Sequence, residues 1–242
     1  MEKLTADSFE IASCQATIFT PDGDLAVSKV MKDLYPSLAE RFDGEPTILP
    51  SMPEGAPPEI PRIIFESTSQ EWRCEFSPAR INVYWRRTSS TEACVSLGDF
   101  FRDAVEILRN YAAQLSPRIA RLAALTTRFS PHEEPGLFLA GHFCKDHWGK
   151  APLDRPENFE LHAHKRFTLA SDFRVNSWAR SKTGKLIGGR VEKVIILFEQ
   201  DLNTIAEEAP EKDFSETEVK KFFLAAAPEL DRILKLYYPG PE

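Results

Sequence analysis

Two blocks of alternating apolar and polar residues, each followed by an amphipathic segment, constrain the fold of this chain more than any other feature. They lie at 61–87 and 158–200, and 72–76 (WRCEF) is a clear example of the alternation. Because successive side chains of a strand point to opposite faces, the pattern indicates antiparallel strands with one buried and one solvated face. Each block divides into three strands, predicted at 61–68, 71–77, 80–87, 158–169, 172–181 and 190–200.

Two further strands and the connections complete the predicted sheets. Residues 8–19 predict a strand ahead of the first block. Residues 118–129 predict the corresponding strand ahead of the second block, although their alanine and leucine content also suits a helix. Lys182-Thr183-Gly184 is interpreted as the turn between the last two strands. Residues 43–61, with six prolines and two glycines, predict an extended surface loop.

Four segments are predicted to be helical. They span 24–42, 96–115, 135–148 and 215–238. Ser96 is placed to cap the second of these helices, and Ser215 with Glu218 forms a capping box for the last. Because proline lacks a backbone N–H, Pro36 and Pro228 are expected to kink or divide their helices.

The order of these elements predicts an α+β protein built from two similar halves. Residues 1–116 and 117–242 both follow the order β-α-β-β-β-α, which suggests an internal duplication within one structural unit. We expect mainly antiparallel sheets that join edge to edge, with the helices packed on one face. The other face of the sheet would then be free to meet a partner.

Cysteine usage and hydropathy predict a soluble cytoplasmic protein. Cys14, Cys74, Cys94 and Cys144 are scattered and form no C-x-x-C pair, which is typical of reduced thiols in a reducing compartment. No apolar run approaches the roughly 18 residues that a membrane-spanning helix requires. The first residues lack the basic and apolar regions of a signal peptide. We therefore expect no membrane association.

The charge is uneven along the chain and suggests a nucleic-acid-binding alternative. The net charge is −7, yet residues 162–193 contain eight Lys and Arg against two acids, while 199–218 contain eight acids against one Lys. Basic strands interleaved with aromatic residues such as Trp178 can contact phosphates and stack on bases. A tryptophan at strand spacing is more often a core residue, however, and a pI of about 5.4 opposes general nucleic-acid affinity. The basic candidates are Lys165, Arg166, Arg174, Arg180, Lys182, Lys185 and Arg190.

The histidines suggest a metal-dependent enzyme as a second alternative. All five lie within 132–164, and two of them share a face of one predicted strand. Pairs of nitrogen and sulfur donors on adjacent elements could hold a tetrahedral zinc ion. The spacing fits no standard zinc motif, so partly exposed structural histidines are the plainer interpretation. The candidate ligands are His142, Cys144, His147, His162 and His164.

Several segments resemble a sporadically distributed family of prokaryotic proteins of similar length and unknown function. The matching segments are 80–87 (RINVYWRR), the helix at Phe100-Phe101 and 194–201 (VIILFEQD). The chain departs from the family at 125–128 (LTTR), where the family usually has a Tyr-Ile-Asn-like run. The resemblance implies a bacterial, single-chain α+β protein and brings no activity with it.

No motif for nucleophilic, phosphate-binding or metal-dependent catalysis occurs in its usual form. The leading hypothesis is therefore a non-enzymatic protein that needs no cofactor. It would bind another protein, or another macromolecule, through an exposed sheet face or through the proline-rich loop. Arg73, Tyr84 and Arg86 are the side chains expected to carry that contact. The sequence leaves the ligand, the partner and the oligomeric state undetermined.

Overall fold

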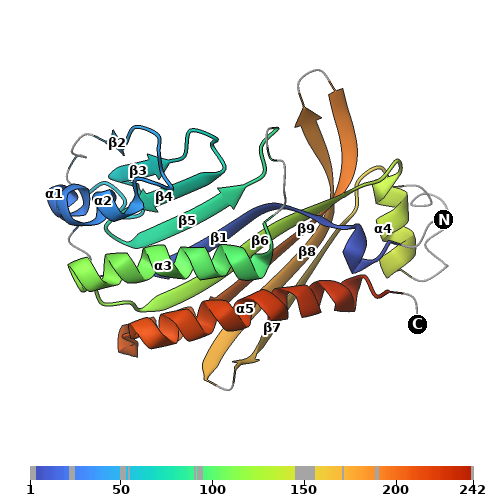
Figure 1. Cartoon of the computed structure of the whole chain (residues 1–242). Coiled ribbons are helices and arrows are strands. Elements are labelled where there is room, and N and C mark those ends of the chain that lie inside the picture. Colours follow the sequence, from blue (N-terminus) through green and yellow to red (C-terminus); the bar gives the residue numbers. More distant parts are fainter. Residues whose placement is uncertain are drawn as a thin grey trace.

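One antiparallel sheet forms the centre of the protein. The computed structural model describes residues 4–21, 25–49, 53, 55–89, 91, 95–144, 156–170, 172–188 and 191–240. Within them nine strands pair in the order β2-β3-β4-β5-β1-β6-β9-β8-β7 (Figure 1). In that order the strands are β2 (Thr47–Ile48), β3 (Ile63–Glu66), β4 (Trp72–Phe76), β5 (Arg80–Arg86), β1 (Glu10–Phe19), β6 (Arg121–Pro131), β9 (Val191–Thr204), β8 (Phe173–Gly188) and β7 (Glu160–Leu169). The predicted α+β class with an antiparallel sheet is confirmed.

The strands of the two halves meet at the middle of this sheet. β1 pairs with β5 on one side and with β6 on the other, so the first strand in sequence has a central place. The strands of 117–242 therefore extend the sheet that the strands of 1–116 begin.

Two long helices, α3 (Leu97–Leu115) and α5 (Glu216–Tyr237), run side by side along the sheet (Figure 1). Both begin at the predicted serine caps. The Ser96 hydroxyl accepts a hydrogen bond from the backbone N–H of Asp99, and Ser215 and Glu218 form a capping box. The other helical segments are short: η1 (Ala6–Ser8), α1 (Val27–Lys29), η2 (Val30–Leu34), α2 (Tyr35–Leu38), α4 (Pro135–Phe143) and η4 (Ala206–Glu211).

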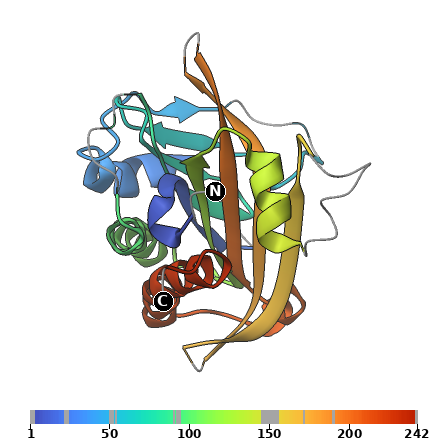
Figure 2. The same ribbon diagram turned by 90° about the vertical axis from the view of Figure 1, so that its right-hand side faces the viewer.

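The sheet has two chemically different faces. On β1, Cys14, Ala16 and Ile18 are buried in the main hydrophobic cluster, and they define the core face. α3 and α5 contribute their apolar side chains to the same cluster, and in Figure 2 both helices lie to the left of β8 and β9. Gln15 and Thr17 alternate with these residues and define the polar face.

Aromatic rings join the helices to the core face. The rings of Phe101 on α3 and Phe223 on α5 stack with centroids 5.7 Å apart. Trp72 on β4 stacks on Phe100 at 5.6 Å. Burial of a Phe side chain stabilises the folded protein by roughly 1.5–3 kcal/mol. The burial of these rings therefore holds the two helices against the core face.

The turn predicted at Lys182-Thr183-Gly184 is wrong. β8 continues to Gly188 and pairs with β9 throughout, with Gly184 opposite Ile195. A Cβ on Gly184 would lie 2.5 Å from Cδ1 of Leu197, so the glycine is required for close packing inside a strand. A glycine is needed at this position, but the reason is the close approach of the Leu197 side chain and not a turn of the backbone.

The two helical prolines act differently from each other. Pro228 lies inside α5, which continues through it, so of the two predicted outcomes, a kink or a division, the division is excluded. The carbonyl of Leu224 loses its helical donor there, and Leu224 is 44% exposed, so water can take that place. Ahead of Pro36 the chain forms the π-turn η2 between α1 and α2, and the helical path continues without a break.

The remaining predictions concern the segment between the halves. Residues 118–129 contain the strand β6 and no helix, which settles the ambiguity of their composition. α4 ends at Phe143 and Cys144 after it is extended, while residues 145–148 of the predicted helix lie outside the described residues. None of the described helices combines the length and apolar character needed to cross a membrane.

Candidate binding site on the polar face of the sheet

One row of side chains crosses the polar face from β3 to β7. Each member lies directly opposite the next on the neighbouring strand, and side chains paired in this way share a face and touch. In order, the row consists of Glu66, Arg73, Tyr84, Gln15, Leu125, Asp201, Trp178 and His164. We refer to these eight residues as the transverse row.

A pocket of about 510 Å³ lies on the second half of this row. β6, β9, β8 and β7 each contribute to it, and we call it the sheet pocket. Its polar-face side chains are Leu125, Thr127, Glu199, Asp201, His162, Trp178 and Arg180. The mixture of one large aromatic ring, one aliphatic chain and several charged groups is that of a binding site.

Trp178 is the main apolar group of the sheet pocket. Its side chain is 45% exposed, although a tryptophan at this spacing is commonly buried. The ring of His164 stacks on it with centroids 4.2 Å apart, and the two planes differ by 24°. Nε2 of His164 lies 3.2 Å from Oδ1 of Asn176, which holds the imidazole in place. One face of the indole is therefore covered by His164 from the β7 side, and the other faces β9.

Asp201 lies directly opposite Trp178 on β9 and lines the same pocket. The carboxylate is half-buried and accepts a hydrogen bond of 2.8 Å from Nδ2 of Asn203. Arg121 donates to Oδ1 of the same asparagine at 2.9 Å, so its guanidinium is linked to Asp201 through Asn203. Burial raises the pKa of Asp201, while the hydrogen bond from Asn203 and the charge of Arg121 oppose that rise.

Most of the predicted basic residues are ion-paired. Arg180 lies 3.2 Å and Lys182 lies 2.7 Å from the carboxylate of Glu199. Three further pairs are Arg166–Glu207 at 2.7 Å, Arg174–Glu208 at 2.7 Å and Lys185–Glu192 at 2.5 Å. Lys165 points to the core-face side of β7, and Arg190 lies outside the described residues. The five paired residues are thus neutralised locally and do not form one positive patch.

The predicted contact residues of the first half do lie together. Arg73 and Tyr84 belong to the transverse row, and Arg86 is on the same face of β5. Glu75 accepts from Nε of Arg73 at 2.8 Å and from the hydroxyl of Tyr84 at 3.1 Å. Burial and the adjacent charge of Glu75 raise the pKa of Tyr84. Arg86 pairs with Glu66 at 3.2 Å, so these side chains are fixed in place.

The predicted metal ligands are divided between the two faces of the sheet. His162 and His164 share the polar face, as predicted. His142 on α4 stacks on Tyr238 at 5.1 Å, and Tyr238 packs on Phe198 of the core face. Nε2 of His142 also lies 2.7 Å from the carbonyl of Tyr237. His142 and the two strand histidines therefore cannot bind one ion.

No group of three or more His, Cys, Asp or Glu side chains in the described part of the chain is placed to hold a metal. Cys144 follows the end of α4 and is half-buried with a free thiol. His147 lies outside the described residues. His162 instead contacts the carboxylate of Glu160 at 2.7 Å, and this hydrogen bond lowers the pKa of Glu160.

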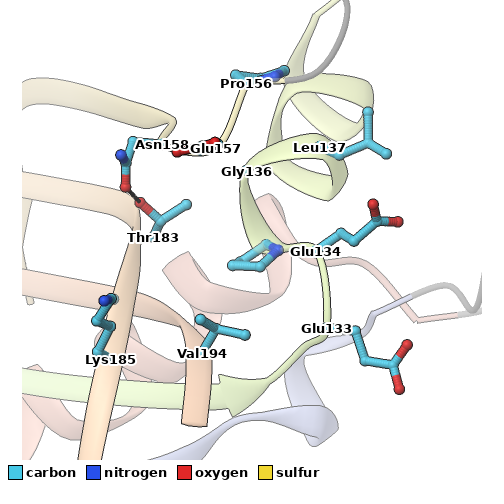
Figure 3. Close-up of a pocket in the computed structure, with 12 residues that line it drawn as sticks. Glu133, Glu134, Gly136, Leu137, Pro156, Glu157, Asn158, Thr183, Lys185 and Val194 are labelled. Atoms are coloured by element: carbon cyan, nitrogen blue, oxygen red, sulfur yellow. Dashed lines mark hydrogen bonds between the residues drawn. The ribbon is translucent and has the colours of Figure 1, made fainter. Parts of the chain in front are cut away.

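A second pocket, of about 720 Å³, lies beside α4 (Figure 3). Thr183 and Asn158 are joined there by a hydrogen bond of 3.1 Å. The backbone approaches very closely at the start of the helix, where a Cβ on Gly136 would lie 2.1 Å from the carbonyl oxygen of Pro156. The acidic residues Glu133, Glu134 and Glu157 and the single amine of Lys185 line this pocket.

Four side chains of the sheet pocket were missed by the sequence reasoning: Leu125, Thr127, Glu199 and Asp201. Asp201 was counted only as one of the eight acids of 199–218 and was not considered as a site residue. The signal that could have found it is the spacing of Glu199, Asp201 and Asn203 at every second position of one strand, which places them on one face. No family model matches the chain, and a search of curated proteins finds no match either.

Proposed function

We propose that this chain is a non-enzymatic binding protein that recognises another protein through the polar face of its sheet. The observation that carries the proposal is the half-exposed indole of Trp178 in the sheet pocket. A large ring left in contact with water has an unfavourable free energy, and a partner that covers it would recover that free energy. Exposed tryptophans of this kind are frequent anchors of protein interfaces.

The neighbouring side chains support a protein partner over a nucleic acid. Tyrosine and arginine are, with tryptophan, the residues that contribute most to interface affinity, and Tyr84 and Arg73 lie in the same row as Trp178. The cations of this face are already balanced by carboxylates, as at Arg180 and Glu199. These carboxylates would repel the phosphates of a nucleic acid. A protein surface that carries charges of both signs could instead match the interspersed cations and carboxylates of this face.

We also propose that the helices leave the polar face uncovered and that the two halves arose by duplication. α3 and α5 both bury their apolar side chains against the core face, which supports the first statement. The strand order supports the second, because β3-β4-β5-β1 in one half corresponds to β7-β8-β9-β6 in the other. A duplicated sheet would give one long face for a single partner.

We place the protein in the cytoplasm on the chemistry of its thiols. Cys14 and Cys74 are buried and unpaired. Burial raises the pKa of Cys14 to about 12, so the reactive thiolate is scarce at neutral pH. Such thiols suit a compartment that keeps cysteine reduced.

The proposal is tested with two matched substitutions. A partner captured from the native organism is identified and purified, and its affinity for the chain is measured by calorimetry. Trp178→Ala is expected to weaken binding roughly 30-fold, the effect of an interface anchor worth about 2 kcal/mol. Leu224→Ala, which removes an equally exposed apolar side chain from α5, is the control and should change affinity less than twofold. Equal affinities for the wild type and Trp178→Ala would refute the proposed surface.

A further inference from the structure

Resting on the proposed function, we propose that the sheet pocket binds the alkylammonium or guanidinium group of a lysine or arginine side chain on the partner. The pocket places a carboxylate next to the free face of an aromatic ring, with an aliphatic side chain on the other side. These are the groups that a cation on an alkyl chain contacts most favourably.

The carboxylate of Asp201 has no cationic partner of its own. Among the residues that the structure describes, no Lys or Arg lies within ion-pair distance of it, and its hydrogen bond comes from the neutral amide of Asn203. The guanidinium of Arg121 acts on this carboxylate from beyond Asn203, so the half-buried group lacks a direct ion pair, which is electrostatically unfavourable. A cation that enters the pocket would provide the direct ion pair.

The free face of Trp178 is directed at the same place. His164 stacks on the β7 side of the indole, so the opposite side faces Asp201 on β9. A cation above the carboxylate would therefore also lie against the ring, where the electron density of the indole attracts positive charge. Leu125, on the far side of Asp201, would pack against the methylene groups of the incoming side chain.

The other charged groups of the pocket do not reverse this preference. Arg180 contacts Glu199 at 3.2 Å and Glu160 at 3.5 Å, so its charge is balanced by two carboxylates. Glu199 in turn is shared with Lys182 at 2.7 Å. His162 also lines the pocket and is held by Glu160. Asp201 is thus the charged group of the pocket that is left to pair with a ligand, and its negative charge favours a cation.

Binding is tested with a pair of short capped peptides, Gly-Ser-Lys-Ser-Gly and the same sequence with norleucine in place of lysine. The readout is the indole N–H resonance of Trp178 in an NMR titration at constant ionic strength, assigned by its loss in Trp178→Phe. The lysine peptide is expected to shift this resonance and the norleucine peptide is not. Equal shifts with both peptides would overturn the inference, because the amine would then contribute nothing.

Two variants show whether Asp201 carries the effect. Asp201→Asn keeps the shape of the side chain and is expected to weaken the lysine peptide about tenfold, since it removes the charge of the ion pair. Glu211→Gln removes an exposed carboxylate from η4 and should leave the affinity within twofold. Undiminished binding by Asp201→Asn would contradict the inference. A free n-butylammonium ion that binds tenfold tighter than the peptide would overturn the assignment to a side chain.

The same variants separate this inference from the function on which it rests. If the purified partner binds Asp201→Asn as tightly as the wild type but loses affinity for Trp178→Ala, the cation site is wrong and the binding surface stands. If neither variant changes the affinity, both proposals fail. Loss of affinity with both variants supports both.

Discussion

Arg128 of β6 and Asp231 of α5 form an ion pair whose two members differ widely in their access to water. The Arg128 side chain is 4% exposed, whereas that of Asp231 is 53% exposed. The pair connects the core face of the sheet to the helix, and Nε of Arg128 has no hydrogen-bond partner in the described part of the chain. A nearly buried guanidinium thus depends on a single carboxylate.

Removal of that carboxylate is expected to destabilise the protein. Asp231→Ala should lower the free energy of unfolding by about 1–3 kcal/mol, the cost of leaving a buried polar group without its partner. Arg128→Met removes the buried charge itself and should cost less, because a hydrophobic side chain of similar length suits the core. Urea denaturation at pH 7 measures both. Glu207→Ala, which breaks the exposed pair with Arg166, is the control and should stay within about 0.5 kcal/mol.

Gly184 and Gly141 should respond in opposite directions to an added methyl group. Gly184→Ala brings a Cβ to 2.5 Å from Cδ1 of Leu197 and is expected to cost about 1–3 kcal/mol. Gly141, in α4, has no atom within 4 Å of the added Cβ, so Gly141→Ala should be neutral or stabilise by up to about 1 kcal/mol. The double variant Gly184→Ala with Leu197→Ala should recover part of the loss. Additive losses in thermal unfolding would contradict the proposed clash.

The hydroxyl of Tyr238 should contribute to stability, whereas that of Tyr237 should not. Tyr238 is fully buried, and its hydroxyl lies 2.5 Å from Oγ of Ser181. Tyr238→Phe is expected to lower the free energy of unfolding by about 1 kcal/mol, and Tyr237→Phe should change it little. Burial raises the pKa of Tyr238 to about 12. The native state therefore holds this proton when the unfolded chain loses it.

That difference gives an alkaline test of the same residue. Above pH 10, where an unfolded tyrosine ionises, the stability of the wild type should fall as the pH rises towards 12. Tyr238→Phe should show a shallower decline over this range. A decline of identical slope in both proteins would show that Tyr238 does not remain neutral in the folded state.

Asp201 should make the protein less stable as the pH rises through the acidic range. Its pKa is raised in the folded state, so the native protein binds more protons than the unfolded chain above the ordinary value of 3.8. Stability from this group is therefore fully present below that value and is lost at higher pH. Asp201→Asn should be at least as stable as the wild type at pH 7, with an advantage that shrinks towards pH 3. Melting temperatures from pH 3 to 7 measure the difference.

The local elements were predictable because their signals lie close together in the sequence. Ser96 and Ser215 mark the helix starts through side chains that bond only three residues away. Alternation along β4 separates its buried face from the face of Arg73. The turn at Gly184 failed because the close approach there comes from Leu197 on another strand, which local composition does not reveal.

The candidate site was predictable only in part. The shared face of His162 and His164 follows from strand periodicity, and so does the position of Tyr84. The order of the strands decides the rest, and pairing between distant segments carries no short sequence signature. It places Asp201 next to Trp178. It also separates His142 from the histidines of β7, although His142 and His162 are only 20 positions apart in the sequence.

The central position of β1 has a consequence for synthesis on the ribosome. Until β6 has emerged, the second edge of β1 has no hydrogen-bonding partner. Until α5 has emerged, Phe101 on α3 lacks the ring of Phe223 on which it stacks. A nascent chain of the first half therefore presents an unpaired strand edge and a bare apolar stripe to the solvent. The main hydrophobic cluster is complete only when α5 has packed against it. A truncated product that lacks α5 would therefore be a substrate for chaperones or proteases.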